Sequence, residues 1–253
     1  MALCIDLSGK SAIVTGAGRG IGRAIAVELA KAGSNVCCVS RTKDQIEETA
    51  SMAKAHGVRA IAVKADISRA QDVKDMVQAA ISQFGRVQIL VANAGIERAS
   101  ALLEQTEEAW DAVIDTNLKS LFLCVREIGA HMIENRYGKI LINASSGGFV
   151  AAPRNAAYHA SKAGAILFCK SVALEWARYN ITVNAIAPGY VDTELMRSLA
   201  KNEETLEKYR KAIPMRRFAK PEEIGPLAAF LVSDFASYIT GEAVLIDGGL
   251  TAT

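Results

Sequence analysis

Tyr158 and Lys162 are the two side chains of this chain whose types and spacing best suit acid–base chemistry. Residues four apart on a helix share a face, so the Lys162 ammonium can lie close to the Tyr158 hydroxyl. A nearby cation favours the ionised phenol and lowers its pKa from about 10, which suits a proton donor or acceptor. A Tyr and a Lys at this spacing also occur by chance, so the pair is evidence of function only together with other motifs. One such motif is the serine pair Ser145-Ser146, which follows an apolar strand pattern.

A glycine-rich turn could bind the phosphates of a dinucleotide. It follows the first predicted strand and precedes a helical pattern, with the sequence Thr15-Gly-Ala-Gly-Arg-Gly-Ile-Gly22. Glycines let the backbone approach a pyrophosphate closely, and helix N-terminal amides hold its charge. We therefore predict that the cofactor contacts Gly16, Gly18, Arg19, Gly20, Ile21 and Gly22.

The residues after the second predicted strand bear on which nicotinamide cofactor is used. An acidic residue at this place binds the adenosine 2′-hydroxyl of NAD, but the chain has Ser40-Arg41. Arg41 offers a charged planar fork to a 2′-phosphate, Ser40 adds a hydroxyl, and Arg19 could supply a second cation. This pattern favours NADP(H) over NAD(H). Asp66 could bind the adenine amino group, with Ile67 beside it, although an Asp at a strand end is equally a routine turn residue.

Short β-branched runs alternate with longer stretches that carry apolar residues at helical spacing. This alternation is typical of a doubly wound parallel sheet, and strands that are apolar on both faces require helices on both sides. We therefore predict an α/β fold, a Rossmann-type doubly wound parallel seven-stranded sheet flanked by helices on both faces. The predicted strands are residues 11–15, 35–40, 60–64, 88–92, 139–144, 182–187 and 243–246, and the predicted helices are 21–32, 43–56, 70–84, 107–134, 157–179 and 221–233.

The chain contains 19 glycines but only five prolines and no proline-rich linker, so we expect residues 1–253 to form one NAD(P)-binding domain. Its least regular stretch follows the sixth predicted strand. Because ligands of this fold class sit beyond the carboxyl ends of the strands, we predict that residues 190–218 form a substrate lid. An ordinary solvated helical connection is the alternative.

Composition excludes several classes of protein. The formal net charge of +2 gives no reason to expect a nucleic-acid partner. The N-terminal sequence lacks the features of a secretory signal, and no apolar stretch approaches the roughly 18 residues of a membrane span, so we expect a cytoplasmic protein with no membrane partner. The five cysteines follow no CxxC spacing, so we expect them to be reduced thiols in the core. The three histidines show no metal-ligand spacing. We expect no catalytic metal.

Together these motifs identify the chain as similar to the short-chain dehydrogenase/reductase family, in its common form of roughly 250 residues, over essentially its full length. The resemblance implies a catalytic tetrad in which Tyr158 moves the proton, Ser145 orients the substrate oxygen, Lys162 binds the nicotinamide ribose, and Asn117 holds a relay water. Counting from Gly138 and from Tyr158 favours Ser145 over Ser146. The resemblance also places Asn93, Ala94, Gly95, Tyr158, Lys162, Pro188, Gly189, Val191 and Thr193 at the cofactor, and it implies a homotetramer.

One residue departs from the family pattern. The chain has Ala92-Asn93-Ala94-Gly95 where the family usually shows Asn-Asn-Ala-Gly, and we expect this loss to affect stability more than chemistry. His159 lies next to Tyr158, but adjacent residues on a helix point about 100° apart, so a packing role is favoured over an acid–base role.

We therefore predict an NADP(H)-dependent oxidoreductase that interconverts a ketone or 3-oxo group of a small molecule and a secondary alcohol, with Tyr158 as general acid or base. The chain resembles 3-oxoacyl-carrier-protein reductases among other members of the family. Its lid is rich in basic residues, which could attract an acidic carrier or could simply form a solvated helix face. Two alternatives remain, an NAD-dependent alcohol dehydrogenase of the same fold and a nucleotide-binding sensor without catalysis.

Overall fold

Seven parallel strands form one sheet in the computed structural model, which describes residues 4–200 and 202–252. The strand order is β3-β2-β1-β4-β5-β6-β7, so the direction of winding reverses between β1 and β4. The predicted α/β fold with a doubly wound sheet is confirmed. The strands are β1 (Ser11–Thr15), β2 (Asn35–Ser40), β3 (Ala60–Lys64), β4 (Ile89–Ala92), β5 (Gly138–Asn143), β6 (Ile181–Pro188) and β7 (Ala243–Ile246).

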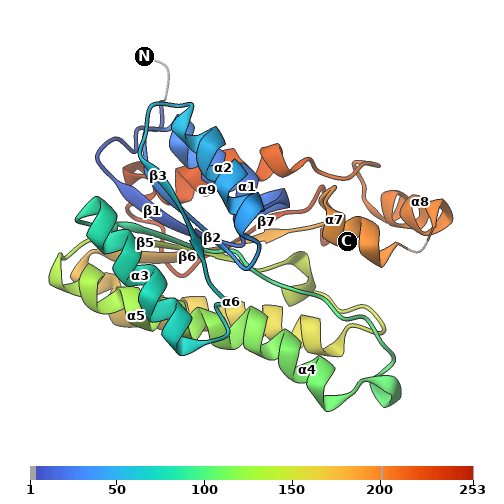
Figure 1. Cartoon of the computed structure of the whole chain (residues 1–253). Helices are drawn as coiled ribbons and strands as arrows, with labels where there is room; N and C mark the ends of the chain where they lie inside the picture. The colour runs from blue at the N-terminus through green and yellow to red at the C-terminus, as the bar shows by residue number, and fades with distance from the viewer. Residues whose placement is uncertain (1–3, 201, 253) are drawn as a thin grey trace.

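Helices cover both faces of the sheet and create two separate cores (Figure 1). On one face, apolar residues of α1, α2 and α9 pack against the sheet, and on the other face α3, α5 and α6 do so. Strands that carry apolar residues on both faces are therefore buried on both, as the sequence pattern required. The helices are α1 (Gly20–Lys31), α2 (Lys43–Lys54), α3 (Ala70–Phe84), α4 (Glu107–Ile114), α5 (Ser120–Glu134), α6 (Ala156–Trp176), α7 (Glu194–Leu199), α8 (Glu203–Ala212) and α9 (Pro221–Leu231), with 3₁₀ turns at Leu102–Glu104, Ser146–Gly148, Ala177–Tyr179 and Asp234–Ala236.

The predicted helix over residues 107–134 is interrupted by a different backbone geometry. Its middle, Asp115–Lys119, is a π-helical segment between α4 and α5. The buried side chain of Asn117 lies within this segment. A π-helical turn is wider than an α-helical one and is common at functional sites, because it changes which backbone groups are paired and where side chains point.

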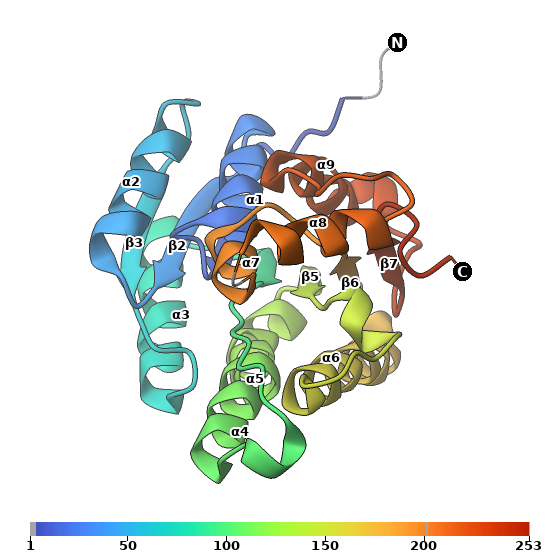
Figure 2. The same ribbon diagram turned by 90° about the vertical axis from the view of Figure 1, so that its right-hand side faces the viewer.

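The loops at the carboxyl ends of the strands gather on one side of the sheet. Figure 2 looks at this side and shows α7 and α8 above the ends of β5 and β6, with α4 and α6 below them. The two ends of the segment that carries α7 and α8 lie side by side. Ala219 donates its backbone N–H to Tyr190, and Asp192 donates to Ala219, at 3.0 and 2.8 Å. These bonds close the base of the segment whose sequence predicted a lid.

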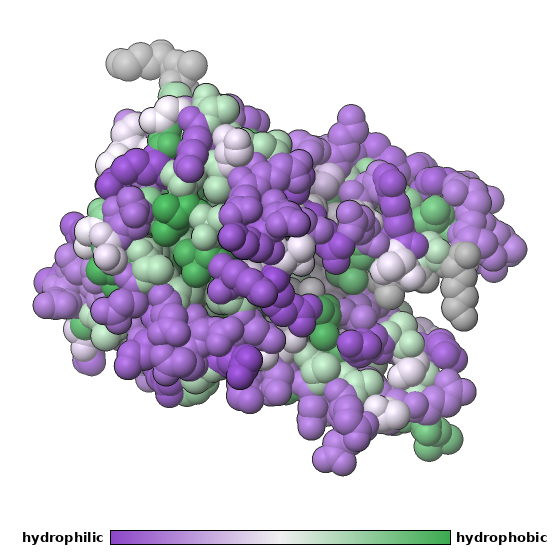
Figure 3. Space-filling model, viewed as in Figure 1, coloured by the Kyte–Doolittle hydropathy of each residue, from purple (hydrophilic) through white to green (hydrophobic). Residues whose placement is uncertain are grey.

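The surface seen in Figure 3 is mostly hydrophilic, and its outline is indented between the part that carries α7 and α8 and the part that carries α4. Among the described residues, no helix is long and apolar enough to cross a membrane. Cys37, Cys38, Cys124 and Cys169 are buried free thiols, as expected, whereas Cys4 is exposed.

Candidate active site

A cavity of about 640 Å³ opens at the carboxyl ends of the strands, in the size range of small-molecule and cofactor sites. It extends from the glycine-rich turn between β1 and α1 to the first turns of α6, and residues between β6 and α8 line one side. With the exception of Asn117, every residue that the sequence predicted for the site lines this cavity. These are Gly16, Gly18, Arg19, Gly20, Ile21, Gly22, Ser40, Arg41, Asp66, Ile67, Asn93, Ala94, Gly95, Ser145, Tyr158, Lys162, Pro188, Gly189, Val191 and Thr193.

The glycine-rich turn is packed too closely for side chains at two of its positions. A methyl group on Gly22 would lie 2.2 Å from the carbonyl oxygen of Gly16, and one on Gly16 would lie 2.8 Å from Asn93 Nδ2. Gly16 also has φ of +65°, a conformation that other residues rarely adopt. The backbone therefore curls tightly at the start of α1 and leaves room for a phosphate group at the helix N-terminus.

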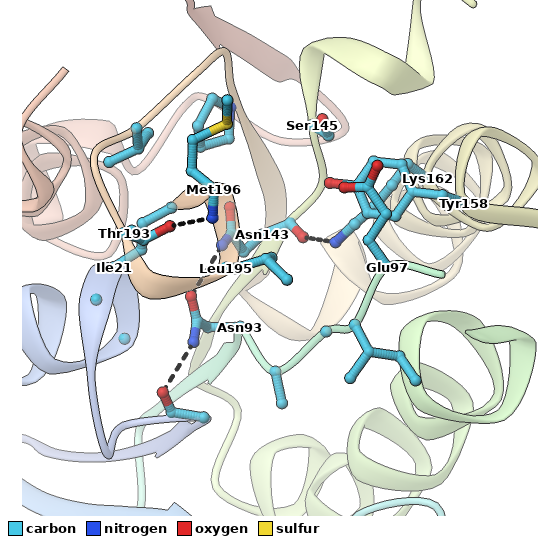
Figure 4. Close-up of a pocket in the computed structure, with 18 of the residues that line it drawn as sticks. Ile21, Asn93, Glu97, Asn143, Ser145, Tyr158, Lys162, Thr193, Leu195 and Met196 are labelled. Carbon is cyan, nitrogen blue, oxygen red and sulfur yellow. Dashed lines mark hydrogen bonds between the residues drawn. The ribbon is translucent and has the colours of Figure 1, made fainter. Parts of the chain in front are cut away.

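Asn93 ties this turn to two neighbouring strands. Its Nδ2 donates to the carbonyl of Thr15 at 2.8 Å, and its Oδ1 accepts from Asn143 Nδ2 at 2.8 Å. Figure 4 shows the bond between Asn93 and Asn143 and the next one, from Lys162 to Asn143. The amide of Asn93 thus holds β1, β4 and β5 together. Ala92 is buried in the core.

Ser40 and Arg41 lie at the end of β2, at the rim of the cavity next to the glycine-rich turn. A methyl group on Gly18 would lie 3.2 Å from Ser40 Oγ, so the serine hydroxyl directly adjoins the turn. Arg41 is exposed, and its charge acts on Asp66. Burial opposes ionisation of Asp66, but hydrogen bonds from Ser68 and the charges of Arg41 and Arg69 lower its pKa. One carboxylate oxygen of Asp66 accepts from both the N–H and the hydroxyl of Ser68, as in a turn.

The side chain of Arg19 is held by an ion pair within the protein. Its guanidinium forms an ion pair with Glu194 at the start of α7, so the glycine-rich turn and α7 are joined across the cavity. Both side chains are exposed, and an exposed pair of this kind contributes about 1 kcal/mol or less. Arg19 is therefore already paired with α7, and Arg41 is the cation at this end better placed to hold a phosphate.

Tyr158, Lys162 and Ser145 meet at the other end of the cavity. Tyr158 and Lys162 lie on one face of α6, with Lys162 Nζ 5.7 Å from the centre of the Tyr158 ring, as their spacing predicts. Ser145 follows β5, and its side chain lies close enough to Tyr158 to lower the pKa of the phenol. Ser145 Oγ also accepts from the backbone N–H of Gly147 at 3.0 Å, which fixes its orientation. Lys162 donates to the carbonyl of Asn143 at 2.8 Å.

Burial has the largest effect on the pKa values of Tyr158 and Lys162. It raises the pKa of Tyr158 to about 12, while Ser145 lowers it and the charge of Glu97 adds to the rise. The direction is opposite to the lowering expected from the sequence, because the effect of burial is the largest of the three. Burial likewise lowers the pKa of Lys162 to about 8. Near neutral pH the protein therefore holds a protonated phenol beside an ammonium group, an arrangement suited to proton donation.

The lowered pKa of Lys162 predicts how replacement by Met changes stability with pH. Between pH 8 and about 10 the unfolded chain holds this proton more tightly than the folded one, so wild-type stability rises with pH. Wild-type protein should therefore gain up to about 1 kcal/mol per pH unit over Lys162→Met across this window. Denaturant unfolding at pH 7, 8, 9 and 10 measures the difference.

The matched control is Lys170→Met, which removes an exposed lysine from the same helix. Its difference from wild type should stay level over the same pH range. A level difference for Lys162→Met as well would show that burial does not perturb this lysine.

Asn117 is buried below the cavity. Its Oδ1 accepts from the backbone N–H of Ile96 at 2.8 Å, and its Nδ2 donates to the carbonyl of Ile96 at 2.9 Å and to Ser161 at 3.1 Å. The side chain therefore anchors the loop after β4 to α6. A methyl group on Gly95 would lie 3.3 Å from Asn117 Oδ1 and 3.4 Å from Lys162 Nζ, so the two side chains approach Gly95 together.

His159 has the packing role that the sequence favoured. Its Nδ1 lies 2.7 Å from the carbonyl of Gly147, and its Nε2 accepts from the backbone N–H of Ala152 at 3.0 Å. Together these bonds require the tautomer with the proton on Nδ1. Both ring nitrogens are thus used to hold the loop after β5, which leaves neither free to exchange a proton with a substrate.

Several residues that line the cavity were not indicated by any sequence motif. Glu97 lies in the loop after β4. Tyr190 follows β6 and Tyr209 lies in α8, and their rings stack with centres 4.9 Å apart. Asn143 Oδ1, also at the cavity, is buried without a hydrogen-bond partner among the described residues. None of these belongs to a periodic pattern, so only the folded chain could bring them together.

The comparisons with known proteins agree over nearly the whole chain. Residues 16–251 match the family model described as enoyl-(acyl carrier protein) reductase. The 3-oxoacyl-(acyl-carrier-protein) reductase FabG of Staphylococcus aureus is 43% identical over 242 residues, which cover 95% of this chain and 98% of that protein. A structure described as a short-chain alcohol dehydrogenase, from Sinorhizobium meliloti, is 39% identical with a TM-score of 0.95, covering 99% of this chain and 100% of the other.

A third relative carries a cofactor. It is described as an NAD(P)-dependent gluconate 5-dehydrogenase, from Beutenbergia cavernae, and its structure has NADP bound at low occupancy. It is 36% identical, with a TM-score of 0.94, and the match covers 99% of this chain and 100% of that one.

Proposed function

The chain belongs to the short-chain dehydrogenase/reductase family, and from this membership we propose that it is an NADP(H)-dependent oxidoreductase that interconverts a ketone or 3-oxo group and a secondary alcohol. The observation that carries the proposal is the layout of one cavity. A tight glycine turn with Ser40 and Arg41 lies at one end, and Tyr158 with Lys162 and Ser145 lies at the other. A dinucleotide placed along it would bring its nicotinamide end toward Tyr158.

Each residue of the tetrad has a separate task in this proposal. When bound, the nicotinamide supplies or accepts the hydride at the substrate carbon. Tyr158 moves the proton at the substrate oxygen, and Ser145 donates a hydrogen bond that stabilises negative charge there. Lys162 holds the nicotinamide ribose and favours the ionised form of Tyr158. Asn117 fixes the loop after β4 and, in the family's pattern, holds a relay water. Burial keeps Tyr158 protonated near neutral pH, so its hydroxyl is ready to donate a proton to the substrate oxygen when the carbonyl is reduced.

The preference for NADP(H) rests on the cation at the end of β2. Arg41 is exposed at the rim of the cavity, where a 2′-phosphate would be held by charge-assisted hydrogen bonds. Ser40 adjoins the glycine turn and could add a hydroxyl. The relative from Beutenbergia cavernae, whose structure contains NADP, supports the same choice.

We propose further that residues 190–218 are a substrate lid within one NAD(P)-binding domain that spans residues 1–253. Tyr190, Leu195, Met196 and Tyr209 line the cavity from this segment. The substrate is proposed to be a small molecule, because the basic side chains of α8 are paired with glutamates on the same helix. The pairs are Lys208 with Glu204, Arg210 with Glu203 and Glu207, and Lys211 with Glu207. Lys201, another basic residue of the proposed lid, lies outside the described residues.

The family also suggests where the protein works and how it assembles. We propose a cytoplasmic homotetramer. Large apolar side chains are exposed on the outer faces of α5 and α6, including Phe122, Leu167 and Leu174. Faces of this kind support contact between subunits.

The proposed function is tested by cofactor binding followed by turnover. NADPH and NADH fluorescence gives the two affinities, and loss of absorbance is then followed with a panel of ketones, 3-oxoacyl thioesters and diketones. We expect tighter binding of NADPH and its oxidation by at least one panel member. Equal binding of the two cofactors would favour the NAD-dependent alternative, and binding without turnover of any member would favour a sensor.

A further inference from the structure

Glu97 is a carboxyl group at the active cavity for which the proposed mechanism has no use. It lies two residues after Gly95, in the loop that follows β4, and is partly buried. The residue before it, Ile96, is held at both backbone groups by the buried side chain of Asn117. The hydrogen bonds between Asn117 and Ile96 therefore also fix the position of Glu97.

The carboxylate faces the reacting end of the cavity. In Figure 4 it points toward Tyr158 and Lys162 of α6. Its charge acts on Tyr158, Lys162 and Tyr190, and the charge of Lys162 acts on it in turn. Burial raises the pKa of Glu97, while Asn155 and the charge of Lys162 oppose the rise. A ketone whose oxygen reaches Tyr158 would therefore place its neighbouring carbon atoms near this carboxylate.

The chemistry of the group next to the carbonyl then decides how well a substrate fits. A hydrocarbon substituent would displace water from the Glu97 carboxylate without replacing its hydrogen bonds, which is unfavourable. A carboxylate substituent would be repelled, and an ammonium substituent would lie beside Lys162. A hydroxyl group can donate a hydrogen bond to Glu97 and carries no charge.

We propose that Glu97 is a specificity-determining residue that accepts a hydrogen bond from a hydroxyl group adjacent to the reacting carbonyl. The substrates are then α-hydroxy ketones, and their products are vicinal diols. This inference rests on the proposed function and adds to it the chemical class of the substrate. A site that hydrogen-bonds a substrate hydroxyl discriminates strongly against the analogue that lacks it.

Hydroxyacetone, methoxyacetone and 2-butanone test this inference with NADPH. Hydroxyacetone and 2-butanone have nearly the same shape and differ in a hydroxyl in place of a methyl group, and methoxyacetone keeps the oxygen but cannot donate. Wild-type enzyme should show a kcat/KM for hydroxyacetone at least about tenfold above that for either analogue. In Glu97→Leu the ratio of hydroxyacetone to 2-butanone should fall by about tenfold or more, through slower turnover of the first and faster turnover of the second.

Two further variants complete the test. Glu97→Gln keeps the shape and one acceptor oxygen, so its ratio should lie between those of wild type and Glu97→Leu, with NADPH affinity unchanged in both. Glu108→Leu makes the same change at an exposed position of α4 outside the cavity and should leave the ratio as in wild type.

The inference is overturned if wild-type enzyme reduces hydroxyacetone no faster than 2-butanone, absence of turnover with both included. It is also overturned if the ratio is the same in wild type and in both Glu97 variants. Failure of the proposed function looks different, because then no member of the wider ketone, thioester and diketone panel oxidises NADPH.

Discussion

Tyr158→Phe should lower kcat by about 10²- to 10⁴-fold, the range expected for loss of a general acid, while NADPH binds within about twofold of wild type. The variant removes only the phenol hydroxyl, which moves the proton in the proposed mechanism. The ring remains, and with it the edge-to-face packing on His159 at 5.9 Å between ring centres. Single-turnover reduction of a panel ketone gives the chemical step, and NADPH fluorescence gives the binding.

A matched control separates this effect from a general response to losing a phenol. Tyr238 is fully exposed and lies outside the cavity, so Tyr238→Phe should keep wild-type activity. If Tyr158→Phe kept more than about a tenth of the wild-type rate, the proton would have to come from another group and the proposed mechanism would be wrong.

Arg41→Asp should move cofactor preference from NADPH toward NADH by about 10- to 100-fold in the ratio of kcat/KM values. The change removes a charge-assisted hydrogen bond, worth about 1.5 to 3 kcal/mol, and places a carboxylate against the 2′-phosphate. The same carboxylate can accept a hydrogen bond from the ribose 2′-hydroxyl of NADH. Steady-state kinetics with each cofactor at a fixed ketone concentration gives the ratio.

Arg69→Asp is the control for this substitution. Arg69 is exposed, and its charge acts on Asp66 as that of Arg41 does, but it does not line the cavity. Its replacement should leave the ratio within about twofold of wild type, because no phosphate contact is lost. An unchanged ratio in Arg41→Asp would mean that the 2′-phosphate is held by other residues or that the enzyme does not distinguish the cofactors.

The sequence predicted the sheet closely because its strands are buried on both faces. Residues such as Val36 to Val39 form an unbroken apolar run, which few structures other than a covered parallel strand can accommodate. The glycine turn and the pair Tyr158 and Lys162 were also predictable, since their function depends on local spacing. The structure places these groups along one cavity.

Other features depend on tertiary contacts that a sequence does not display. The π-helical turn around Asn117 carries no proline or glycine to mark it, and the helical pattern runs through it. The pKa of Tyr158 depends on the burial of its side chain, which raises it, whereas the spacing of Lys162 predicted a net lowering. Glu97 follows a recognisable motif, but its position beside Tyr158 arises from the fold of a loop held by Asn117.

The order of the strands has a consequence for how the chain is made. Because neighbouring strands are all parallel, none of them pairs through a tight hairpin, and β1 pairs with β4 across 77 residues, from Ala12 to Ile89. During synthesis, one edge of β1 therefore stays unpaired until β4 has left the ribosome, and an unpaired apolar strand is prone to aggregate. The long loop closure also slows folding of the finished chain. The same reversal of strand order that opens the cavity between β1 and β4 is thus the step at which the newly made protein is most exposed to misfolding.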